Sequence, residues 1–469
     1  MRILRRLLFI LALPFVLLAH PACAQTQSTS PSEALLGAWS AEEDYFRPIF
    51  RFERSDGGAV TAFLAGDTSQ EGNSFSSTTV RSDSIFLELA PANAQFRGAL
   101  SEDGTRIEGT WTQGRRTASL TFRPVSEDDA SGPSRPQEPE PPYPYDTEEV
   151  TFSNSSDGIT LPGTLTLPKE SGPHPAVVLL SGTGPQDRNA EAHHHKPFLV
   201  LADHLTRHGI AVLRYDKRGV AESEGSFMSA RFDDLARDAA TALRFLKERS
   251  DIEERETGLL GLSEGGSLAP MVSERFEDAS FLVLLAAPSV PGHELLTGQN
   301  ERALALPLDA PEAAVDSLQR VNRLIFEVTH SDLDSTDAAQ RVQAILKEEG
   351  IAGERLRRLT KQATAPGGRY FARYDPQPVL RKLSVPVLAL YGSKDLQVPP
   401  TQNAGPMRSA LEESSGDETT VRVLTGLNHM FQPADTGHPN EYGQIETTMD
   451  PEALDVIADW IREHASASE

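Results

Sequence analysis

Apolar and polar positions follow different patterns in the two parts of the chain. Between residues 31 and 124 they alternate in short segments such as AVTAFLA and SIFLELA, separated by Asp-Gly turns. Alternation with a period of two is typical of strands that bury only one face. We therefore expect residues 31–124 to form a small antiparallel β domain.

From about residue 148 the apolar positions gather into continuous runs, with stretches of helical periodicity such as 197–208 between them. Unbroken apolar runs are typical of parallel strands that are covered on both faces. The segment 148–469 therefore predicts a doubly wound α/β sheet. The predicted strands are AVVLLS (176–181), IAVLRY (210–215), TGLLGL (257–262), FLVLLA (281–286), VPVLALYG (385–392) and TTVRVLT (419–425).

Two segments interrupt this organisation. Residues 125–147 are rich in proline and acidic residues and predict a stiff, extended linker. Residues from about 290 to 375 are polar with helical periodicity, and they predict a helical insert between late strands. Such an insert usually lies over the carboxyl edge of the sheet, where ligands bind.

The first 24 residues combine three arginines, an apolar run and the small-residue sequence Ala22-Cys23-Ala24. We expect residues 1–24 to be a cleaved signal peptide and the mature protein to be periplasmic or extracellular. Lipid anchoring at Cys23 is not expected, because the preceding HPA matches the lipid-attachment pattern poorly. No later apolar run predicts a stable membrane span. Cys23 is the only cysteine, so the mature chain is expected to have neither a disulfide nor a thiol nucleophile.

The chain is acidic, with 44 basic and 68 acidic residues and a formal net charge of −24. Cleavage of the signal removes three arginines and leaves −27. So negative a charge argues against a nucleic-acid partner. Only eight of the basic residues are lysines. An acidic, lysine-poor surface is typical of proteins adapted to high salt, where repulsion among carboxylates is screened.

One serine lies among glycines directly after a predicted strand, in the segment LLGLSEGGSLAP. Gly261-Leu262-Ser263-Glu264-Gly265 fits the Gly-x-Ser-x-Gly pattern of a nucleophile elbow, a strained turn that exposes the serine between strand and helix. Side chains two residues either side of the serine would collide with the neighbouring strand and helix, so glycine is expected there. An ordinary glycine-rich turn is the alternative. Ser263 is thus the candidate nucleophile.

A nucleophilic serine needs a histidine base, and the base needs an orienting acid. In chains with this elbow they follow in the order acid, then histidine. LYGSKDLQVPP places Asp395 after one predicted strand, and LTGLNHMF places His429 after the next. The ends of parallel strands meet at one sheet edge, so Ser263, Asp395 and His429 are predicted to form a catalytic triad. His438 is the alternative base.

Acyl transfer also needs N–H donors for the oxyanion. The backbone N–H of Glu264, next to the nucleophile, is one candidate. The glycine-rich segment LLSGTGPQDRN supplies a second, for which Thr183 is the first choice and Gly184 the next. A phosphate-binding loop is the rival interpretation of this segment, but it lacks the required Gly-Lys-Ser/Thr ending.

Two further motifs receive no catalytic role. The adjacent histidines at 193–195 lack ligand partners at helical spacing, and they predict a polar loop near the site rather than a metal centre. YDKRG (215–219) predicts a structural turn in which Asp216 and Arg218 make local hydrogen bonds. We expect no cofactor and no metal ion.

Five ordered motifs make the chain resemble the α/β-hydrolase superfamily, and within it the exported serine-aminopeptidase-like esterases: LLSGTGPQDRN, HKPFLVLADHLTRHGIAVLRYDKRG, GLSEGG, YGSKDLQVP and LNHMFQPADTG. The resemblance covers about residues 147–465 and implies a mostly parallel eight-stranded sheet with flanking helices and a helical cap insert. It assigns nucleophile, acid and base to Ser263, Asp395 and His429. Leu262 departs from the histidine that often precedes the serine, but this removes no proton-transfer group. The N-terminal segment with GTWTQG resembles an accessory domain of some members.

The resemblance implies hydrolysis of an ester, thioester or amide through an acyl-enzyme. We favour a carboxylesterase with a small-molecule ester substrate. A serine peptidase with a peptide substrate and a thioesterase are the alternatives. A peptidase needs an acidic pocket for the amine, but the insert carboxylates, such as Glu294, Glu301 and Asp309, are expected to form a solvated acidic face. A glycan-binding protein with a non-catalytic hydrolase domain is a remote alternative, against which the complete triad argues.

Overall fold

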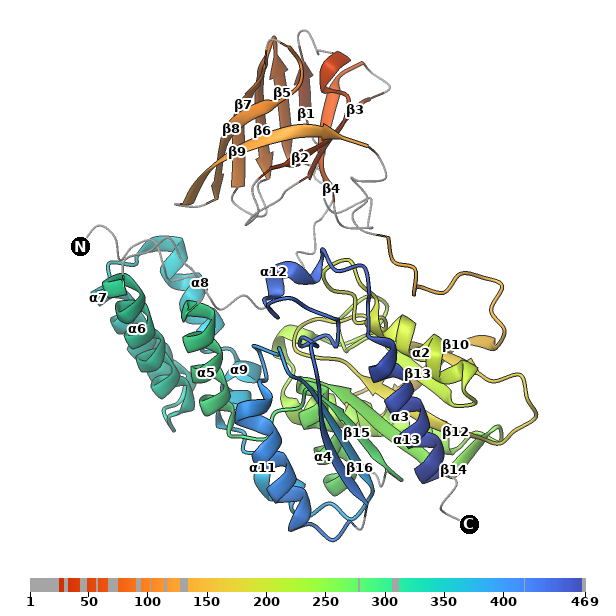
Figure 1. Cartoon of the computed structure of the whole chain (residues 1–469). Coiled ribbons are helices and arrows are strands. Elements are labelled where there is room, and N and C mark those ends of the chain that lie inside the picture. Colours follow the sequence, from red (N-terminus) through yellow and green to blue (C-terminus); the bar gives the residue numbers. More distant parts are fainter. Residues whose placement is uncertain are drawn as a thin grey trace. The chain divides into compact units, whose positions relative to one another are not determined.

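The structure is a computed structural model in which the chain forms two compact units, divided between Ser134 and Arg135 (Figure 1). The predicted signal peptide, residues 1–24, lies outside the described residues. The structure describes residues 25–28, 33–42, 49–55, 58–65, 75–89, 94–101, 103–113, 116–126, 134–276, 279–305, 312–416 and 418–465.

The first unit is a β sheet with the strand order β1-β5-β6-β7-β8-β9-β2-β3-β4. Only the pair of β1 and β5 is parallel among the described strands, so the unit is antiparallel as predicted. Phe50 stacks on Phe122 in the core, with ring centroids 4.3 Å apart. The elements are β1 (Gln25–Ser28), η2 (Glu33–Leu35), β2 (Gly37–Ala41), β3 (Ile49–Arg54), β4 (Val60–Ala65), β5 (Ser77–Arg81), β6 (Ser84–Leu89), β7 (Ala94–Leu100), β8 (Ile107–Gln113) and β9 (Arg116–Val125).

The second unit is built on an eight-stranded sheet in the order β10-β11-β13-β12-β14-β15-β16-β17. The hairpin of β10 and β11 is antiparallel, as is the pairing of β11 with β13, and all pairs from β13 to β17 are parallel. This is the mostly parallel α/β sheet that the sequence predicts. The strands are β10 (Asp146–Asn154), β11 (Ile159–Leu167), β12 (His174–Leu180), β13 (Ala211–Tyr215), β14 (Ile252–Leu262), β15 (Leu282–Leu285), β16 (Val387–Gly392) and β17 (Thr419–Leu424).

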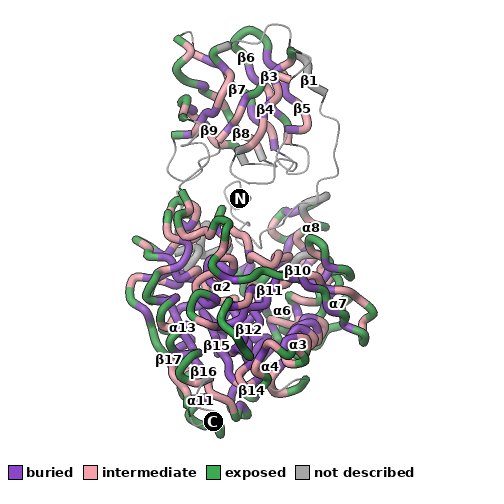
Figure 2. Tube along the Cα trace, turned by 90° about the vertical axis from the view of Figure 1, so that its right-hand side faces the viewer, coloured by how far each residue is buried: buried purple, intermediate pink, exposed green. Residues whose placement is uncertain are grey.

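Helices cover both faces of this sheet. On one face, α2 (Pro197–Arg207) and α13 (Pro451–Ala465) share a hydrophobic cluster with strand residues that include Leu260. On the other, α3 (Phe232–Lys247), α4 (Glu264–Arg275) and α11 (Pro400–Glu412) share a cluster that includes Leu259. Neighbouring residues of one strand thus enter different clusters, and the central strands are buried on both sides (Figure 2). This double burial explains their unbroken apolar runs.

The predicted insert at about 290–375 contains five described helices between β15 and β16 (Figure 1). Two of them, α6 and α7, pack around a small core of their own, which includes Val321 and Leu346. The insert helices are α5 (Gly292–Ala305), α6 (Glu312–His330), α7 (Ser335–Glu348), α8 (Gly353–Ala363) and α9 (Pro366–Arg373). The short elements η4 (Phe227–Ser229), α10 (Gln377–Leu380) and α12 (Pro439–Tyr442) lie outside the insert.

The predicted linker, residues 125–147, is anchored over its second half. The Arg135 guanidinium donates hydrogen bonds to the carbonyl oxygens of His194 at 2.8 Å, Gly443 at 2.8 Å and Ile445 at 2.7 Å. These bonds fix the chain from Arg135 onward to loops of the α/β unit, so this part is not a free spacer.

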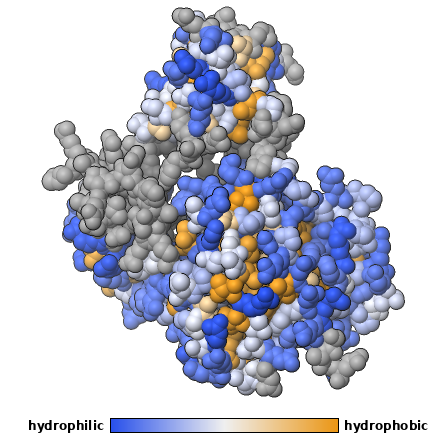
Figure 3. Space-filling model, viewed as in Figure 1, coloured by the Kyte–Doolittle hydropathy of each residue, from blue (hydrophilic) through white to orange (hydrophobic). Residues whose placement is uncertain are grey.

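The face of the α/β unit seen in Figure 3 is mostly hydrophilic, with a narrower apolar strip among the polar side chains. Among the described helices, none has the length and apolar character needed to cross a bilayer.

Candidate functional site

Ser263 lies in a strained turn between β14 and α4. Its φ of +55° and ψ of −114° are outside the backbone regions that non-glycine residues favour. The surrounding glycines are a matter of space. A Cβ on Gly261 would lie 2.1 Å from the carbonyl oxygen of Gly265, and a Cβ on Gly265 would lie 2.0 Å from that of Leu180. No side chain fits at either position, so the collision that the sequence analysis expected is the reason for both glycines.

Asp395 and His429 lie together after the ends of β16 and β17. His429 Nδ1 donates to Asp395 Oδ2 at 2.8 Å, and both side chains are buried. The other carboxylate oxygen, Oδ1, accepts the backbone N–H groups of Gln397 at 2.7 Å and Val398 at 2.8 Å. Three donors thus hold the carboxylate, which in turn fixes the imidazole and leaves Nε2 for another partner.

His438, the alternative base, does not share this carboxylate. Its Nδ1 accepts the backbone N–H of Asn440 at 3.0 Å and caps α12. The structure therefore pairs Asp395 with His429. Ser263 follows β14 of the same parallel sheet, so all three candidate residues lie at one sheet edge. The hydrogen bonds of the described residues include none between Ser263 and His429.

The glycine-rich segment after β12 lies against the serine turn. A Cβ on Gly182 would be 3.5 Å from the Cβ of Ser263. In the described part of the chain, the backbone N–H groups of Thr183, Gly184 and Glu264 donate to no other protein atom. Glu264 also begins α4, and a helix N-terminus favours negative charge. The predicted donors therefore remain available to an anionic oxygen.

Lys217, which the sequence analysis left without a role, connects the two donor segments. Its Nζ donates to the carbonyl oxygen of Gly182 at 2.5 Å and to Glu264 Oε1 at 3.0 Å. The side chains of Lys217 and Glu264 are only 6% and 12% exposed. Arg188, from the same glycine-rich segment, pairs with the buried Asp216, with Nη2 2.8 Å from Oδ2. The sequence held one signal for the role of Lys217: it is one of few lysines in the chain, and it lies just after the end of the buried strand β13.

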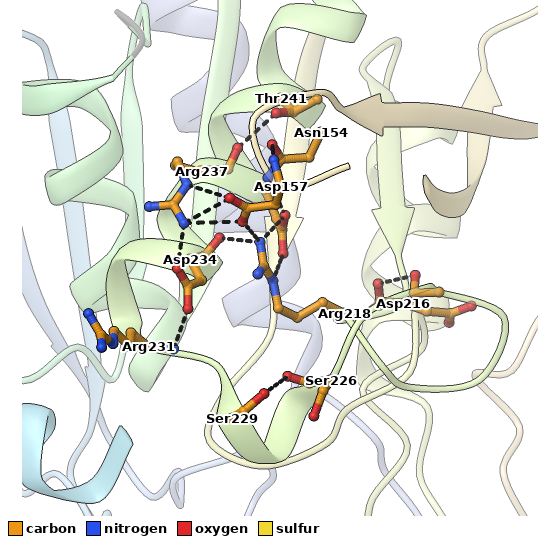
Figure 4. Close-up of polar contacts among 12 residues, drawn as sticks. Asn154, Asp157, Asp216, Arg218, Ser226, Ser229, Arg231, Asp234, Arg237 and Thr241 are labelled. Carbon is orange, nitrogen blue, oxygen red and sulfur yellow. Dashed lines mark hydrogen bonds and ion pairs between the residues drawn. The ribbon is translucent and has the colours of Figure 1, made fainter. Parts of the chain in front are cut away.

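The YDKRG motif reaches further than the predicted local turn (Figure 4). Arg218 donates to Asp238 on α3 at 2.6 Å and to Asp157, in the turn between β10 and β11, also at 2.6 Å. Arg237 pairs with Asp157 and with Asp234. Burial raises the pKa of Asp238, and the hydrogen bonds from Arg218 oppose that rise. The prediction of local bonds was too narrow, because the long guanidinium ties the β10–β11 hairpin to α3.

His195, the last of the three adjacent histidines, has a structural role. Its Nε2 lies 3.0 Å from the carbonyl oxygen of Tyr442, and its Nδ1 lies 2.8 Å from the hydroxyl of Thr448. Burial and the nearby charge of Arg135 lower the pKa of His195 to about 4. Since protein groups occupy both ring nitrogens, His195 has no nitrogen to offer to a metal ion.

Sheet order, serine turn and flanking helices together define an α/β hydrolase. A family model described as "Serine aminopeptidase, S33" matches residues 176–433, which is more than half of the chain. The chain belongs to this family and is a hydrolase.

Individual relatives match about two thirds of the chain. Esterase EstD of Thermotoga maritima is 29% identical over 325 residues, which are 68% of this chain and 68% of the relative. An uncharacterised 31.7 kDa protein of Escherichia coli is 24% identical over 321 residues, which are 67% of this chain and 99% of the relative. Among solved structures, the Pyrococcus furiosus esterase Pf2001 has a TM-score of 0.42 and 13% identity, covering 68% of this chain and 92% of that one.

Proposed function

We propose that the chain is a serine carboxylesterase that works through Ser263, His429 and Asp395. The Ser263 oxygen attacks the ester carbonyl carbon while His429 Nε2 takes the hydroxyl proton, and the carbonyl oxygen becomes an oxyanion. When this intermediate collapses, the carbon–oxygen bond to the alcohol breaks and His429 gives the proton to the leaving oxygen. A water molecule, deprotonated by His429, then attacks the acyl carbon. The bond from that carbon to the Ser263 oxygen breaks, His429 returns its proton to this oxygen, and the carboxylic acid leaves.

The observation that carries this proposal is the buried His429–Asp395 hydrogen bond of 2.8 Å at the sheet edge where Ser263 adopts its strained turn. The carboxylate holds the imidazole in the tautomer that a base requires and stabilises the imidazolium that forms. The bond from Ser263 to His429 is expected to tighten when substrate binds, because such bonds are often long in substrate-free enzymes. Thr183 and Glu264 supply the N–H donors for the oxyanion.

Ser263→Ala tests the nucleophile. Ester hydrolysis should fall by about four to six powers of ten while the fold is kept, because triad members act as a unit. A fluorophosphonate probe should label the wild type and not the variant. Ser267→Ala is the matched control, since Ser267 is buried in α4, which begins directly after Ser263, and its hydroxyl has no hydrogen-bond partner among the described residues. Substantial activity in Ser263→Ala, or a wild type that the probe does not label, would count against an enzyme of this kind.

An ester substrate is supported by the relative EstD, which is named an esterase. An alkoxide also leaves with less help than an amine, which must be protonated while the peptide is held in register. We expect kcat/KM for short-chain p-nitrophenyl esters to exceed that for alanyl or prolyl p-nitroanilides at least about a hundredfold. Ethyl esters in the same panel remove the advantage of the activated leaving group, and thioesters test the thioesterase alternative. An anilide that matches the esters would favour a peptidase, and a thioester that outruns them a thioesterase.

We also propose that the protein is exported to the periplasm or the cell exterior. The proposal rests on the charged, apolar and small-residue regions of residues 1–24. Full-length protein expressed in a bacterial host should be recovered from the periplasmic fraction or the medium with Gln25 as its first residue. Recovery of the uncleaved chain in the cytoplasm would contradict export.

A further inference from the structure

We propose that Lys217 is a positioning residue that orients both oxyanion donors, an inference that rests on the proposed function. Its Nζ lies 2.5 Å from the carbonyl oxygen of Gly182 and 3.0 Å from Glu264 Oε1. Gly182 immediately precedes the donor Thr183, and Glu264 is itself the other donor. One ammonium group therefore contacts both segments from which the oxyanion is held.

The contact with Gly182 sets the direction of the Thr183 N–H. In a planar trans peptide, the carbonyl of one residue and the N–H of the next point in opposite directions. Because Lys217 holds the Gly182 carbonyl oxygen on its own side, the N–H of Thr183 is directed to the opposite side. A glycine-rich segment has little side-chain packing to stop this peptide from rotating. The ammonium supplies the missing restraint.

The contact with Glu264 acts on the second donor. The Glu264 carboxylate belongs to the residue that follows Ser263, and a negative charge there disfavours an oxyanion. The ion pair with Lys217 balances that charge and restrains the first residue of α4. Because Lys217 and Glu264 are 6% and 12% exposed, solvent screens the pair only weakly. Lys217 thus influences the orientation and the potential of the site without transferring a proton.

Lys217→Met tests this role by keeping most of the side-chain length and removing the charge. One oxyanion donor is typically worth about a hundredfold or more in kcat, so we expect kcat for p-nitrophenyl esters to fall about tenfold to a thousandfold. KM should change less than about threefold. The kcat is counted per active site titrated with fluorophosphonate, so misfolded protein does not contribute. Affinity for a trifluoromethyl ketone, which forms an oxyanion adduct with the serine, should fall in parallel.

Lys196→Met is the matched control, because Lys196 makes a part-buried pair with Glu138 at 3.1 Å outside the candidate site. It should keep both kcat and inhibitor affinity. Unchanged kcat per titrated site in Lys217→Met would overturn the inference and leave the proposed function intact. A wild type that does not react with the fluorophosphonate would overturn the proposed function first. Should Lys217→Met fail to fold, Lys217→Gln is judged by the same two measurements.

A second inference rests on an independent cluster that joins α2 to α13. We infer that His204, His208 and Asp455 bind a divalent transition-metal ion such as Zn²⁺. One ligand atom from each residue lies within 4.8 Å of the others. His204 and His208 are four residues apart at the end of α2, and Asp455 is on α13. Two imidazoles at this helical spacing with one carboxylate are a donor set that suits Zn²⁺, with water as the fourth ligand.

The hydrogen bonding of the two rings supports a cation at this place. His208 Nδ1 donates to the carbonyl oxygen of His204 at 2.7 Å, which leaves the Nε2 lone pair of the neutral ring for a metal. His204 Nε2 lies 3.2 Å from Asp455 Oδ1, yet it is buried and makes no hydrogen bond. The contact thus has the distance of an ion pair without the alignment of a hydrogen bond. A metal ion between the three groups would satisfy all of them.

Zn²⁺ titration of full-length protein treated with EDTA tests the site. Calorimetry should detect a Zn²⁺ ion whose binding raises the melting temperature of the α/β unit. Co²⁺ should give the visible spectrum of tetrahedral coordination. His208→Ala should weaken binding at least about tenfold and abolish the rise in melting temperature. His464→Ala is the control, since His464 faces a single carboxylate, Glu418, at 3.2 Å. No stoichiometric binding by the wild type, or equal binding by His208→Ala, would overturn the inference.

Discussion

Mild acid should destabilise the α/β unit in part through one buried histidine, His195. Its side chain is buried, and its ring nitrogens contact the Tyr442 carbonyl, the Gln432 side-chain amide and the Thr448 hydroxyl. Burial, followed by the charge of Arg135, lowers the pKa of His195 from 6.5 to about 4. The folded protein thus disfavours the protonated ring, and the unfolded chain binds the extra proton first as the pH falls.

The size of the effect follows from the two pKa values of His195. Each tenfold difference in proton affinity corresponds to about 1.4 kcal/mol. The gap between 6.5 and about 4 therefore amounts to roughly 3 kcal/mol of unfolding free energy when the pH lies below both values. At pH 5 the loss relative to pH 7.5 is about 2 kcal/mol. This contribution is complete above pH 6.5 and disappears as the pH falls through 4.

His195→Gln removes the titration and keeps an N–H group for the Tyr442 carbonyl. Urea unfolding at pH 7.5 and 5, followed by helical circular dichroism, reports on the α/β unit because the described α-helices belong to it. Between the two pH values, the wild type should lose about 2 kcal/mol more than the variant. Carboxylates titrate alike in both proteins and cancel in this difference. If the two proteins lose the same free energy, the buried ring does not titrate as its surroundings require, and the reasoning is refuted.

Three further predictions concern packing and charge. Gly265→Ala should cost more than about 3 kcal/mol or prevent soluble expression, because the new Cβ would lie 2.0 Å from the Leu180 carbonyl oxygen. Gly405→Ala in α11 should instead raise the melting temperature slightly, because no atom lies within 4 Å of the added Cβ. Equal melting temperatures of the two variants would contradict the steric argument. Arg218→Met leaves Asp238 buried without its cation and should cost about 3–5 kcal/mol in urea unfolding, whereas a loss under about 1 kcal/mol would show the network to be dispensable. With −27 on the mature chain that we propose, the melting temperature should rise from low to molar potassium chloride, and a flat or falling series would speak against salt adaptation.

The central strands and the serine turn could be predicted because their causes are local. Strands such as β15 and β16 are buried on both faces and show it as unbroken apolar runs. The glycines around Ser263 are forced by atoms of the same turn and of the adjacent strand end. By contrast, the bounds of β10 were not predicted. Its first four residues are exposed and acidic or polar, and its burial then alternates, so no apolar run marks it.

The contacts of the site were predictable only where strand order alone brings residues together. Asp395 and His429 each follow a predicted strand of a parallel sheet. They were therefore predicted at one sheet edge, where the structure has their 2.8 Å hydrogen bond. Lys217 is different, because its environment depends on Gly182 and Glu264, which come from two other strand ends. The residues next to a lysine in the sequence do not show whether its ammonium group will be buried between two distant segments.

The hydrogen bonds of Arg135 define the first residue that has to be kept when the α/β unit is separated from the N-terminal domain. The composition of the segment around Arg135 is that of a spacer. Its guanidinium nevertheless donates hydrogen bonds to three loop carbonyl groups, two of which lie more than 300 residues away in the sequence. Truncation at the first strand of the sheet would leave those carbonyls without their donor. If the N-terminal domain is exchanged for that of a related hydrolase, the two chains should therefore be joined upstream of Arg135. The hydrogen bonds of Arg135 to the α/β unit are then kept.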